Sequence, residues 1–400
     1  MMASLDPRTT PVIVSAVRTP IGRFMGGLAP LAAPKLGAVA VREAVRRAGV
    51  AVGDVEEVIL GNVVQGGVGQ APARQAALAA GLPGTVAALT INKVCGSGLK
   101  AVMLAAQAVK AGDASCVVAG GMESMSNAPF YLFGLRTGVK LGNQNLVDGV
   151  IHDGLWCSFG DCHMGAYAEY TATKAGVSRE EQDRFALDSH RKAVAAQQAG
   201  AFDAEIVPVE IADRKSTVTI AKDEAPRADS TLEALAKLKP AFVKDGTVTA
   251  GNAPGLNDGA SALVVTSLAF ARERGLTPLA RITAYATGGG EPREIFFAPI
   301  VAVQALMKKE GKAIGDYDLI EANEAFAVQA LADGRALGWD FARVNVNGGA
   351  VALGHPIGAS GARVLTTLLY ALEARSKSTG LATLCLGGGN AVALSVERIA

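Results

Sequence analysis

The sequence predicts an α/β fold made of two similar halves with an insertion between them. Apolar runs of strand length alternate with amphipathic helical stretches near both ends of the 400-residue chain. The last third repeats the order of the first, whereas the segment between them is irregular. Half of the residues are hydrophobic, 19% are charged and 5% are aromatic. This composition suits close contacts between helices and strands in layers.

Strands and helices alternate in the first third. Apolar residues three or four apart indicate the helices, and a proline opens the second of them. Short runs of apolar residues indicate the strands. The predicted strands are 12–17, 58–60, 86–91 and 116–119, and the predicted helices are 36–48, 72–80 and 98–111. This order predicts a sheet with helices on both faces.

The middle of the chain is predicted to be an inserted domain over residues 126–256. It contains irregular, glycine-rich stretches, a polar helix over 178–198 and a segment of mixed charge. Insertions on regular scaffolds commonly carry ligand contacts. We assign residues 1–125 plus 257–278 to the N-terminal half and residues 279–400 to the C-terminal half.

An internal repeat aligns two glycine-rich loops from the two halves. His355 lies 260 positions after Cys95, and Asn323 lies 261 positions after Asn62. Cys95 and His355 each follow a strand-like run and precede a helix, and a strand that ends in glycines comes next. A duplicated fold would therefore bring these two loops near each other across a pseudo-twofold axis.

Cys95 is the leading candidate for a nucleophile because it lies where a strand leads into a helix. A thiol at a helix N-terminus is near free N–H groups, which stabilise the thiolate, and the neighbouring glycines let a carbonyl approach closely. A buried structural cysteine is the alternative. Residues 96–101 also fit a short GxGxxA dinucleotide pattern, in which Glu123 would be the acidic partner.

Three further residues are candidates for the same site. His355 precedes a helix that we expect Ser360 to cap, and its imidazole would deprotonate a thiol or donate to an oxyanion. Cys385 ends a strand before three glycines whose N–H groups would hold an oxyanion, although a buried strand cysteine is the simpler alternative. Asn323 also follows a strand, where its amide would orient a water or cap a helix.

Charge and cysteine spacing exclude several classes of function. The chain has 38 basic and 37 acidic residues, which gives no long-range attraction to nucleic acid or to an anionic membrane. No apolar run reaches the roughly 18 residues that span a bilayer, and no targeting signal is evident. The five cysteines lack the spacing of a disulfide framework or a metal site. We expect a cytoplasmic protein without a bound metal.

Four segments together resemble the thiolase family, and the likeness runs from Val14 to Arg398. They are NKVCGSGL at 92–99, NEAF at 323–326, NGGAVALGHPIGASGA at 347–362 and CLGGG at 385–389, with support from GTVTAGN at 246–252 and NDGA at 257–260. The resemblance implies duplicated βαβαβαββ halves that form a five-layered α-β-α-β-α core. It also implies that the insertion is a loop domain that binds coenzyme A and supports a homotetramer.

The resemblance implies a reaction and a role for each candidate. Two acetyl-CoA molecules would condense reversibly to acetoacetyl-CoA and CoA through an acetyl-cysteine intermediate. Cys95 would be the nucleophile, His355 its activator, and Cys385 the acid/base toward the acetyl-CoA methyl group. One oxyanion site would combine His355 with a water held by Asn323. The other would use the N–H groups of Cys95 and Gly387.

A second set of residues is expected to bind the substrate and coenzyme A. The string CHMG at 162–165 is similar to that of acetoacetyl-CoA thiolases, in which the histidine lines a short-acyl pocket. Arg227 falls where family members contact the nucleotide end of coenzyme A. The expected binding residues are His163, Met164, Leu155, Arg227, Phe242, Ala250, Pro254, Ala325 and Phe326.

The chain departs from the family pattern at three places. Pro254 stands where members often carry a serine that touches the pantetheine, and Asn390 follows the triple glycine in place of Met or Gln. Residues 295–299, IFFAP, replace the common Met-Gly-x-Gly-Pro and are closer to the mitochondrial acetoacetyl-CoA branch. Because some members of that branch bind potassium, potassium is a candidate cofactor. We expect no tightly bound cofactor, since coenzyme A is substrate and product.

The leading expectation is acetyl-CoA C-acetyltransferase activity in lipid metabolism. A 3-ketoacyl-CoA thiolase of fatty-acid β-oxidation with a broader chain range is the alternative, which His163 disfavours and the altered 295–299 segment permits. Two other classes of protein have less support. A nicotinamide oxidoreductase would depend on the GxGxxA match alone. A non-catalytic lipid-binding relative would have lost its nucleophile, whereas Cys95 is present here. The expected partners are acetyl-CoA, acetoacetyl-CoA and CoA, without nucleic acid or membrane.

Overall fold

A computed structural model describes residues 6–212 and 216–399 of the chain. Ten strands form one mixed sheet. They are β1 (Pro11–Arg18), β2 (Gly22–Arg23), β3 (Glu57–Gly61), β4 (Ala87–Ile91), β5 (Cys116–Ser124), β12 (Asn257–Ser267), β13 (Ala280–Gly289), β14 (Leu319–Ala322), β15 (Thr379–Leu386) and β16 (Asn390–Glu397). Their order is β14-β15-β16-β13-β1-β12-β5-β3-β4, and β2 lies beside β12.

The sheet has two halves that repeat one pattern and join along a short seam. Each half contains a parallel pair of strands, β3 with β5 in one and β14 with β15 in the other, and a long antiparallel strand adds to each pair. The halves meet where β1 pairs with β13 through Val12 and Ile13 only. The strand β12 pairs with β1 and β5 although a long segment of chain separates it from β5.

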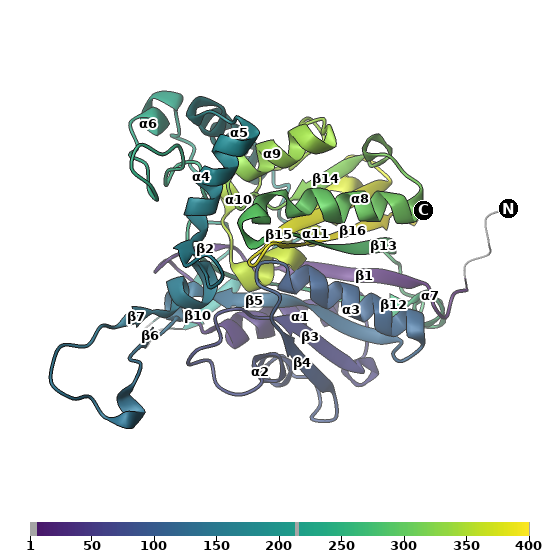
Figure 1. Cartoon of the computed structure of the whole chain (residues 1–400). Coiled ribbons are helices and arrows are strands. Elements are labelled where there is room, and N and C mark those ends of the chain that lie inside the picture. Colours follow the sequence, from purple (N-terminus) through teal and green to yellow (C-terminus); the bar gives the residue numbers. More distant parts are fainter. Residues whose placement is uncertain (1–5, 213–215, 400) are drawn as a thin grey trace.

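Helices cover the sheet on the outside and also fill the space between its two halves. The helices are α1 (Ala33–Ala48), α2 (Pro72–Ala79), α3 (Ser97–Ala111), α4 (Met164–Ala175), α5 (Arg179–Gln198), α6 (Leu232–Ala236), α7 (Leu268–Glu273), α8 (Ala298–Glu310), α9 (Ala327–Leu337), α10 (Ala350–Leu353) and α11 (Ile357–Ala374). Helices α3 and α11 share one apolar cluster with both halves of the sheet. Helices α1 and α2 cover the outer face of one half, and α8 covers that of the other (Figure 1). These are the five layers that the resemblance implied.

The two central helices approach each other at their N-terminal ends, where only glycine fits. A Cβ atom on Gly98 would lie 2.6 Å from the amide nitrogen of Ala362. A Cβ atom on Gly361 would lie 2.3 Å from the amide nitrogen of Leu99. Because the helices approach so closely here, the loops that precede α3 and α11 come together at one edge of the layered core.

The predicted elements occur, and they differ from the prediction only at their ends, as for α1, which begins at Ala33 and not at residue 36. The predicted strand 116–119 continues to Ser124 as β5, because Gly120 and Gly121 lie inside the strand and do not end it. A Cβ atom on Gly121 would lie 2.0 Å from the carbonyl oxygen of Gly358, so the glycine serves the contact with α11. The polar helix begins at Arg179, and Ser178 caps it in a capping box with Glu181.

Three short two-stranded ribbons lie in the segment between β5 and β12. They are β6 (Phe130–Tyr131) with β7 (Val147–Asp148), β8 (Trp156–Cys157) with β9 (Cys162–His163), and β10 (Val209–Ala212) with β11 (Thr217–Ile220). The chain from β6 to β7 forms an arm, residues 130–148, that extends away from the rest of the molecule (Figure 1). No helix in the described part of the chain is long and apolar enough to cross a membrane.

Candidate active site

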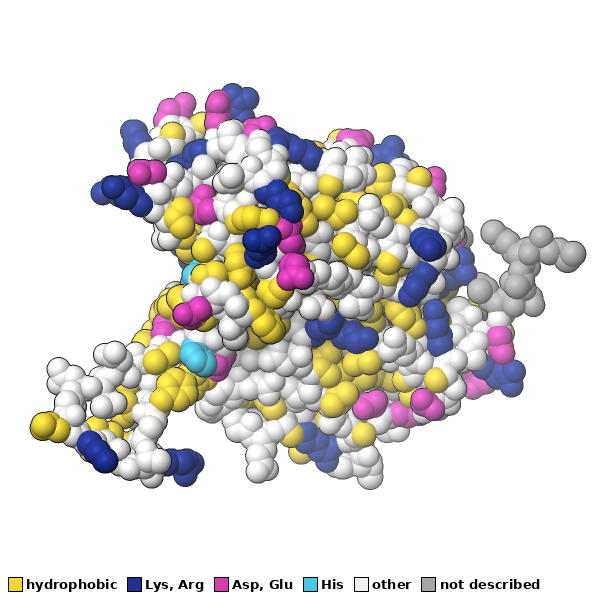
Figure 2. Space-filling view, in the orientation of Figure 1, with side chains coloured by type: hydrophobic (Ala, Val, Ile, Leu, Met, Phe, Trp, Pro, Cys, Tyr) yellow, Lys and Arg dark blue, Asp and Glu magenta, His cyan; other side chains and the backbone are white. Residues whose placement is uncertain are grey.

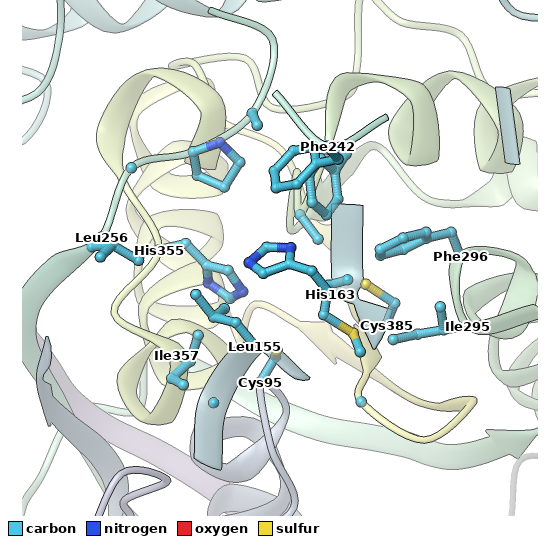
Figure 3. A pocket seen from close by; sticks show the side chains of 18 of the residues that line it. Cys95, Leu155, His163, Phe242, Leu256, Ile295, Phe296, His355, Ile357 and Cys385 are labelled. Atoms are coloured by element: carbon cyan, nitrogen blue, oxygen red, sulfur yellow. The ribbon is translucent and has the colours of Figure 1, made fainter. Parts of the chain in front are cut away.

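A cavity of about 290 Å³ lies where loops from both halves meet the segment between them. Cys95, His355 and Cys385 border it from the layered core, and His163 and Phe242 border it from the intervening segment. Figure 3 shows these side chains directed toward one common space. In Figure 2 the surface is hollowed between the arm and helices α4 to α6, and hydrophobic side chains border the hollow. Thus the internal repeat correctly predicted that Cys95 and His355 come together.

The turn before α3 holds Cys95 in a strained but well-bonded backbone. Val94 has a φ of 47°, which is an unusual conformation for a β-branched residue. The N–H group of Lys93 donates to Ser97 Oγ at 2.8 Å, and Ser97 Oγ donates to the carbonyl oxygen of Val94 at 2.6 Å. The N–H group of Val94 donates to Asn92 Oδ1 at 3.0 Å. These bonds fix the position of the sulfur at the start of the helix.

Cys95 is a neutral thiol in the unliganded site. Its side chain keeps some exposure to the cavity, but protein atoms surround the sulfur, and this burial raises its pKa to about 12. Hydrogen bonds from the N–H groups of Gly387 and of Cys95 itself lower the pKa by a smaller amount. The N–H groups near the start of the helix therefore favour the thiolate, as predicted, but the cost of burying the charge is larger, so the thiol stays neutral.

His355 is held in one tautomer by a chain of hydrogen bonds. Its backbone N–H group donates to Asn257 Oδ1 at 2.8 Å, and its Nδ1 lies 2.6 Å from Ser360 Oγ. Ser360 Oγ donates its single hydrogen to the carbonyl oxygen of Pro356 at 2.9 Å, so it must accept the bond from His355. Nδ1 therefore carries the proton, and Nε2 is left as an acceptor.

Ser360 has a role that the sequence did not predict. We expected it to cap the helix, but α11 begins at Ile357, after Pro356, so Ser360 lies one turn inside the helix. There its hydroxyl bonds back to the preceding turn and at the same time accepts from His355. The spacing of five positions between the two residues is the signal that would have indicated this contact.

His355 and Asn323 form a buried polar pair. Burial lowers the pKa of His355 to about 3, with a further contribution from Arg363, so the imidazole is neutral at pH 7. Asn323 Nδ2 lies 3.4 Å from His355 Nε2. Asn323 Oδ1 is buried without a hydrogen-bond partner among the described residues. Asn323 is not a helix cap, because α9 begins only at Ala327.

Cys385 reaches the cavity from the hairpin of β15 and β16. It pairs with Ala391, and Gly387, Gly388 and Gly389 make the turn. Only 1% of the residue is exposed, and burial raises the pKa of its thiol well above the ordinary value. The nearby Cys95 raises it further. Two neutral thiols therefore face the cavity from the two halves.

Aromatic side chains enclose the side of the cavity next to Cys385. The His163 ring stacks on Phe242 with 4.7 Å between centroids, and its Nδ1 accepts from the N–H group of Gly165 at 3.0 Å. Phe326 packs edge-on against Phe242 at 6.0 Å and against Phe296 at 5.2 Å. Burial lowers the pKa of His163, so this ring is also neutral. The result is an apolar wall with a single N–H donor, His163 Nε2.

Most of the residues expected to bind substrate border this cavity. They are His163, Met164, Leu155, Phe242, Ala250, Pro254, Ala325 and Phe326. Arg227 is the exception: it lies outside the cavity lining, and its backbone N–H group donates to His190 Nδ1 at 3.2 Å. A contact between Arg227 and coenzyme A stays a prediction. The structure adds Ile295 and Phe296 to the lining; the sequence had marked their segment only as a departure from pattern.

The chain matches two family models and many characterised proteins. Residues 11–269 match the thiolase N-terminal domain, and residues 276–398 match the thiolase C-terminal domain. The chain belongs to the thiolase family. It is 56% identical to an acetyl-CoA acetyltransferase of Pseudomonas aeruginosa and to one of Escherichia coli, each over 97% of this chain and 99% of the relative. The crystal structure of the Bacillus anthracis acetyl-CoA acetyltransferase superposes with a TM-score of 0.96 at 45% identity, covering 98% of this chain and 99% of that one.

The acidic residue that the dinucleotide pattern at residues 96–101 requires has a structural role in this thiolase. Glu123, its expected acidic partner, is fully buried and accepts hydrogen bonds from the N–H groups of Val63, Val64 and Gly358 and from Asn62 Nδ2. These bonds occupy both of its oxygens, and Oε2 joins Val63 from one half of the fold to Gly358 from the other.

In the described part of the chain, no group of three or more His, Cys, Asp or Glu side chains could hold a metal ion.

Proposed function

We propose that this thiolase is an acetyl-CoA acetyltransferase that joins two acetyl-CoA molecules into acetoacetyl-CoA and CoA and also catalyses the reverse reaction. The observation that carries the proposal is the meeting of Cys95, His355 and Cys385 in one apolar cavity. The names of the relatives from Pseudomonas aeruginosa and Escherichia coli support the same activity.

In the first step Cys95 Sγ attacks the thioester carbonyl of acetyl-CoA. A thiol with a pKa of about 12 and an imidazole with a pKa of about 3 do not exchange a proton at rest. The proton therefore moves to His355 Nε2 as the sulfur–carbon bond forms, and it leaves with the CoA thiolate. The N–H groups of Cys95 and Gly387, which bond the resting sulfur, are well directed to hold the oxyanion.

In the second step Cys385 passes its thiol proton to His355 Nε2, and the resulting thiolate removes a proton from the methyl group of a second acetyl-CoA. The carbanion attacks the acetyl group on Cys95, acetoacetyl-CoA leaves, and the freed Cys95 thiolate takes the proton back from His355. His355, once protonated at Nε2, would hold the enolate oxygen together with a water that Asn323 orients. The free Oδ1 of Asn323 supports this role, because a buried amide oxygen favours a polar partner.

The acyl end of the cavity suits a short chain. Ile295, Phe296 and Phe326 pack together beside Cys385, and we propose that their side chains limit the length of the acyl chain. Thiolysis rates of acetoacetyl-CoA and of longer 3-ketoacyl-CoA substrates test this. We expect kcat/KM to fall steeply as the chain lengthens; equal values for longer chains would favour the broader β-oxidation thiolase instead.

The remaining proposals concern location, assembly and ions. We propose a cytoplasmic homotetramer of lipid metabolism that binds neither nucleic acid nor membrane and needs only coenzyme A esters, with potassium as a candidate ion. The arm supports an assembly, because Phe130, Phe133, Leu135, Leu141 and Leu146 on it are exposed. Sedimentation of the full chain tests this, since a monomer would contradict a tetramer built through the arm.

A further inference from the structure

The hairpin of β8 and β9 places two cysteines directly opposite each other. Cys157 on β8 is the cross-strand partner of Cys162 on β9, and four residues, 158–161, connect them. Directly opposed residues in antiparallel strands have Cα atoms about 4.5–5.5 Å apart. A disulfide needs a Cα separation of about 4.4–6.8 Å. The backbone pairing alone therefore meets the main distance requirement for a bond between these cysteines.

The two thiols also lie on the same face of the hairpin. The hydroxyl of Tyr167 on α4 lies near both thiols, and their proximity raises the pKa of this hydroxyl, with Cys157 having the larger effect. A single oxygen can contact both sulfur atoms only if the two side chains converge on it. Cross-strand partners are expected to do so, because opposed side chains point to the same side of a ribbon. Both cysteines are free thiols in the structure.

The two cysteines differ in their access to solvent. Cys162 is partly exposed, whereas Cys157 is 3% exposed. A small disulfide from solution would therefore react at Cys162 first, and the buried Cys157 would be the internal partner that resolves the mixed disulfide. A partly exposed cysteine opposite a buried one suits a site where the first is attacked and the second closes the bond.

We propose that Cys157 and Cys162 form a thiol–disulfide exchange site that is separate from the catalytic pair and takes a low-molecular-weight disulfide as its oxidant. Cys162 attacks the external disulfide, forms a mixed disulfide and releases one small thiol. Cys157 then attacks Cys162 Sγ and releases the second small thiol. The protein loses two protons and two electrons, and the external disulfide gains both.

The bond would act next to the substrate cavity. His163 follows Cys162 directly and borders the cavity, and Leu155, which lies just before β8, borders it as well. The crosslink joins β9, which carries His163, to β8, which directly follows Leu155, and it changes the surroundings of the Tyr167 hydroxyl. The site is thus placed to couple the thiol–disulfide balance to the wall of the cavity that faces the acyl group.

Peptide mass mapping of the full chain tests the proposal without measuring activity. The reduced protein is equilibrated with glutathione disulfide, its free thiols are alkylated, and it is digested. Trypsin leaves both cysteines in the peptide 141–174, whose only basic cleavage residue is the terminal Lys174, and cleavage before Asp161 separates them. We expect the tryptic peptide to lose two hydrogens and to carry no alkyl group. Cleavage before Asp161 should leave the two fragments linked until dithiothreitol is added.

Three variants give the controls. Cys157→Ser should carry one glutathione, on Cys162, and Cys162→Ser should keep Cys157 free. Tyr167→Phe retains both thiols and should still form the bond, so it controls for disturbance of α4. Alkylation of both cysteines after oxidation, or a stable glutathione adduct on Cys162 of the unmodified chain, would overturn the proposal. Neither outcome bears on acetyl transfer at Cys95, so the proposed function is tested separately.

Discussion

The reactivity of the site depends on how single side chains are held in a buried environment. His355 is neutral, and the hydrogen bonds of Ser360 leave only its Nε2 free to accept a proton. Cys95 is also neutral, because burial outweighs the two N–H groups that favour its thiolate. The pair therefore rests uncharged, and the substrate carbonyl is needed before the proton moves. We therefore expect the resting Cys95 thiol to react slowly with general thiol reagents.

Ser360→Ala should slow acetylation while leaving the fold intact. The substitution removes the acceptor of His355 Nδ1, and an unsatisfied buried donor costs about 1–3 kcal/mol, or roughly 10- to 100-fold in rate. Stability should also fall by about the same 1–3 kcal/mol, because the unpaired donor stays buried in the folded protein. Stopped-flow acetylation across pH is the measurement, with Ser360→Thr as the control that keeps a hydroxyl. Equal rates for Ala and Thr would contradict the role of the hydroxyl.

Cys385→Ala should separate the two steps of the reaction. In the proposed mechanism Cys385 removes the methyl proton during condensation, and positioned proton transfer contributes about 10²- to 10⁴-fold. Condensation should fall by that amount, whereas acetylation of Cys95 should stay within about 10-fold because Cys385 takes no proton in that step. Acetyl incorporation and acetoacetyl-CoA formation are measured on one sample. An equal loss in both steps would exclude the assigned role.

Sequence reasoning reached some side chains of the site and not others. Cys95, His355, Cys385 and Asn323 follow strands in glycine-rich or repeated strings, so local pattern and the repeat were enough to mark them. Ser360 was mistaken for a cap, because its position before a helix is also typical of caps. Its contact depends on where α11 begins, at Ile357, which local pattern does not determine to within a turn.

At the scale of elements, the site depends on two helices that begin side by side. Gly98 and Gly361 allow α3 and α11 to approach until their backbones are in contact. The central helices and buried strands were predictable, since their apolar periodicity is strong. The short turn at Pro292–Phe297 was not, because its packing against α4 and α9 comes from distant segments of the chain.

Ile295→Ala should broaden the acyl range of the enzyme. Ile295 is buried in this turn and borders the cavity. One methylene of pocket space changes discrimination by about 1–3 kcal/mol, so kcat/KM for a substrate two carbons longer should rise about 10-fold relative to acetoacetyl-CoA. The free energy of unfolding should fall by about 2–5 kcal/mol. This loss does not affect the ratio of the kcat/KM values for the two substrates, because both are measured on the same folded enzyme.

Val301→Ala on the exposed face of the adjacent α8 is the matched control for that substitution. It shortens an apolar side chain that is 45% exposed and does not border the cavity. Its ratio of rates for the two chain lengths should equal that of the unmodified enzyme. If Ile295→Ala also left the ratio unchanged, the turn would not set the chain length.

At the scale of the whole molecule, buried polar groups tie the halves and the intervening segment together. Glu123 accepts hydrogen bonds from the N–H group of Val63 in one half and from that of Gly358 in the other. Arg18 on β1 is fully buried and pairs with Glu205 and Asp223 from the intervening segment at 2.6 Å each. Removing one partner of a buried ion pair strongly destabilises the folded protein, because the other charge is left unpaired. These pairs therefore favour a single arrangement of the regions that they join.

His190 should make a contribution to stability that is lost in mild acid. Burial and the neighbouring Arg227 lower the pKa of His190 to about 4, whereas Asp229 opposes this. Between pH 6.5 and 4 the unfolded chain binds a proton at this position and the folded chain does not, so acid favours unfolding. Urea unfolding at pH 7, 6 and 5 should show that the free energy of unfolding of the unmodified chain falls relative to that of His190→Gln as the pH decreases.

The glutamine in that variant can still accept from the backbone N–H group of Arg227, so the variant removes the titration and keeps the hydrogen bond. Other buried groups, such as Glu123 with a pKa raised to about 7, are present in both proteins and cancel in the comparison. Parallel curves for the two proteins would show that His190 does not titrate on unfolding.

Acetylation of Cys95 is the most direct test of the central claim that two halves of one fold assemble a two-cysteine acetyl-transfer site. Trypsin releases Cys95 in the short peptide 94–100, between Lys93 and Lys100. After the full chain is mixed with acetyl-CoA and quenched in acid, this peptide should carry one acetyl group. The label should be absent from Cys95→Ala and present on Cys385→Ala. An acetyl label retained by Cys95→Ala, or none on the unmodified enzyme, would contradict the claim.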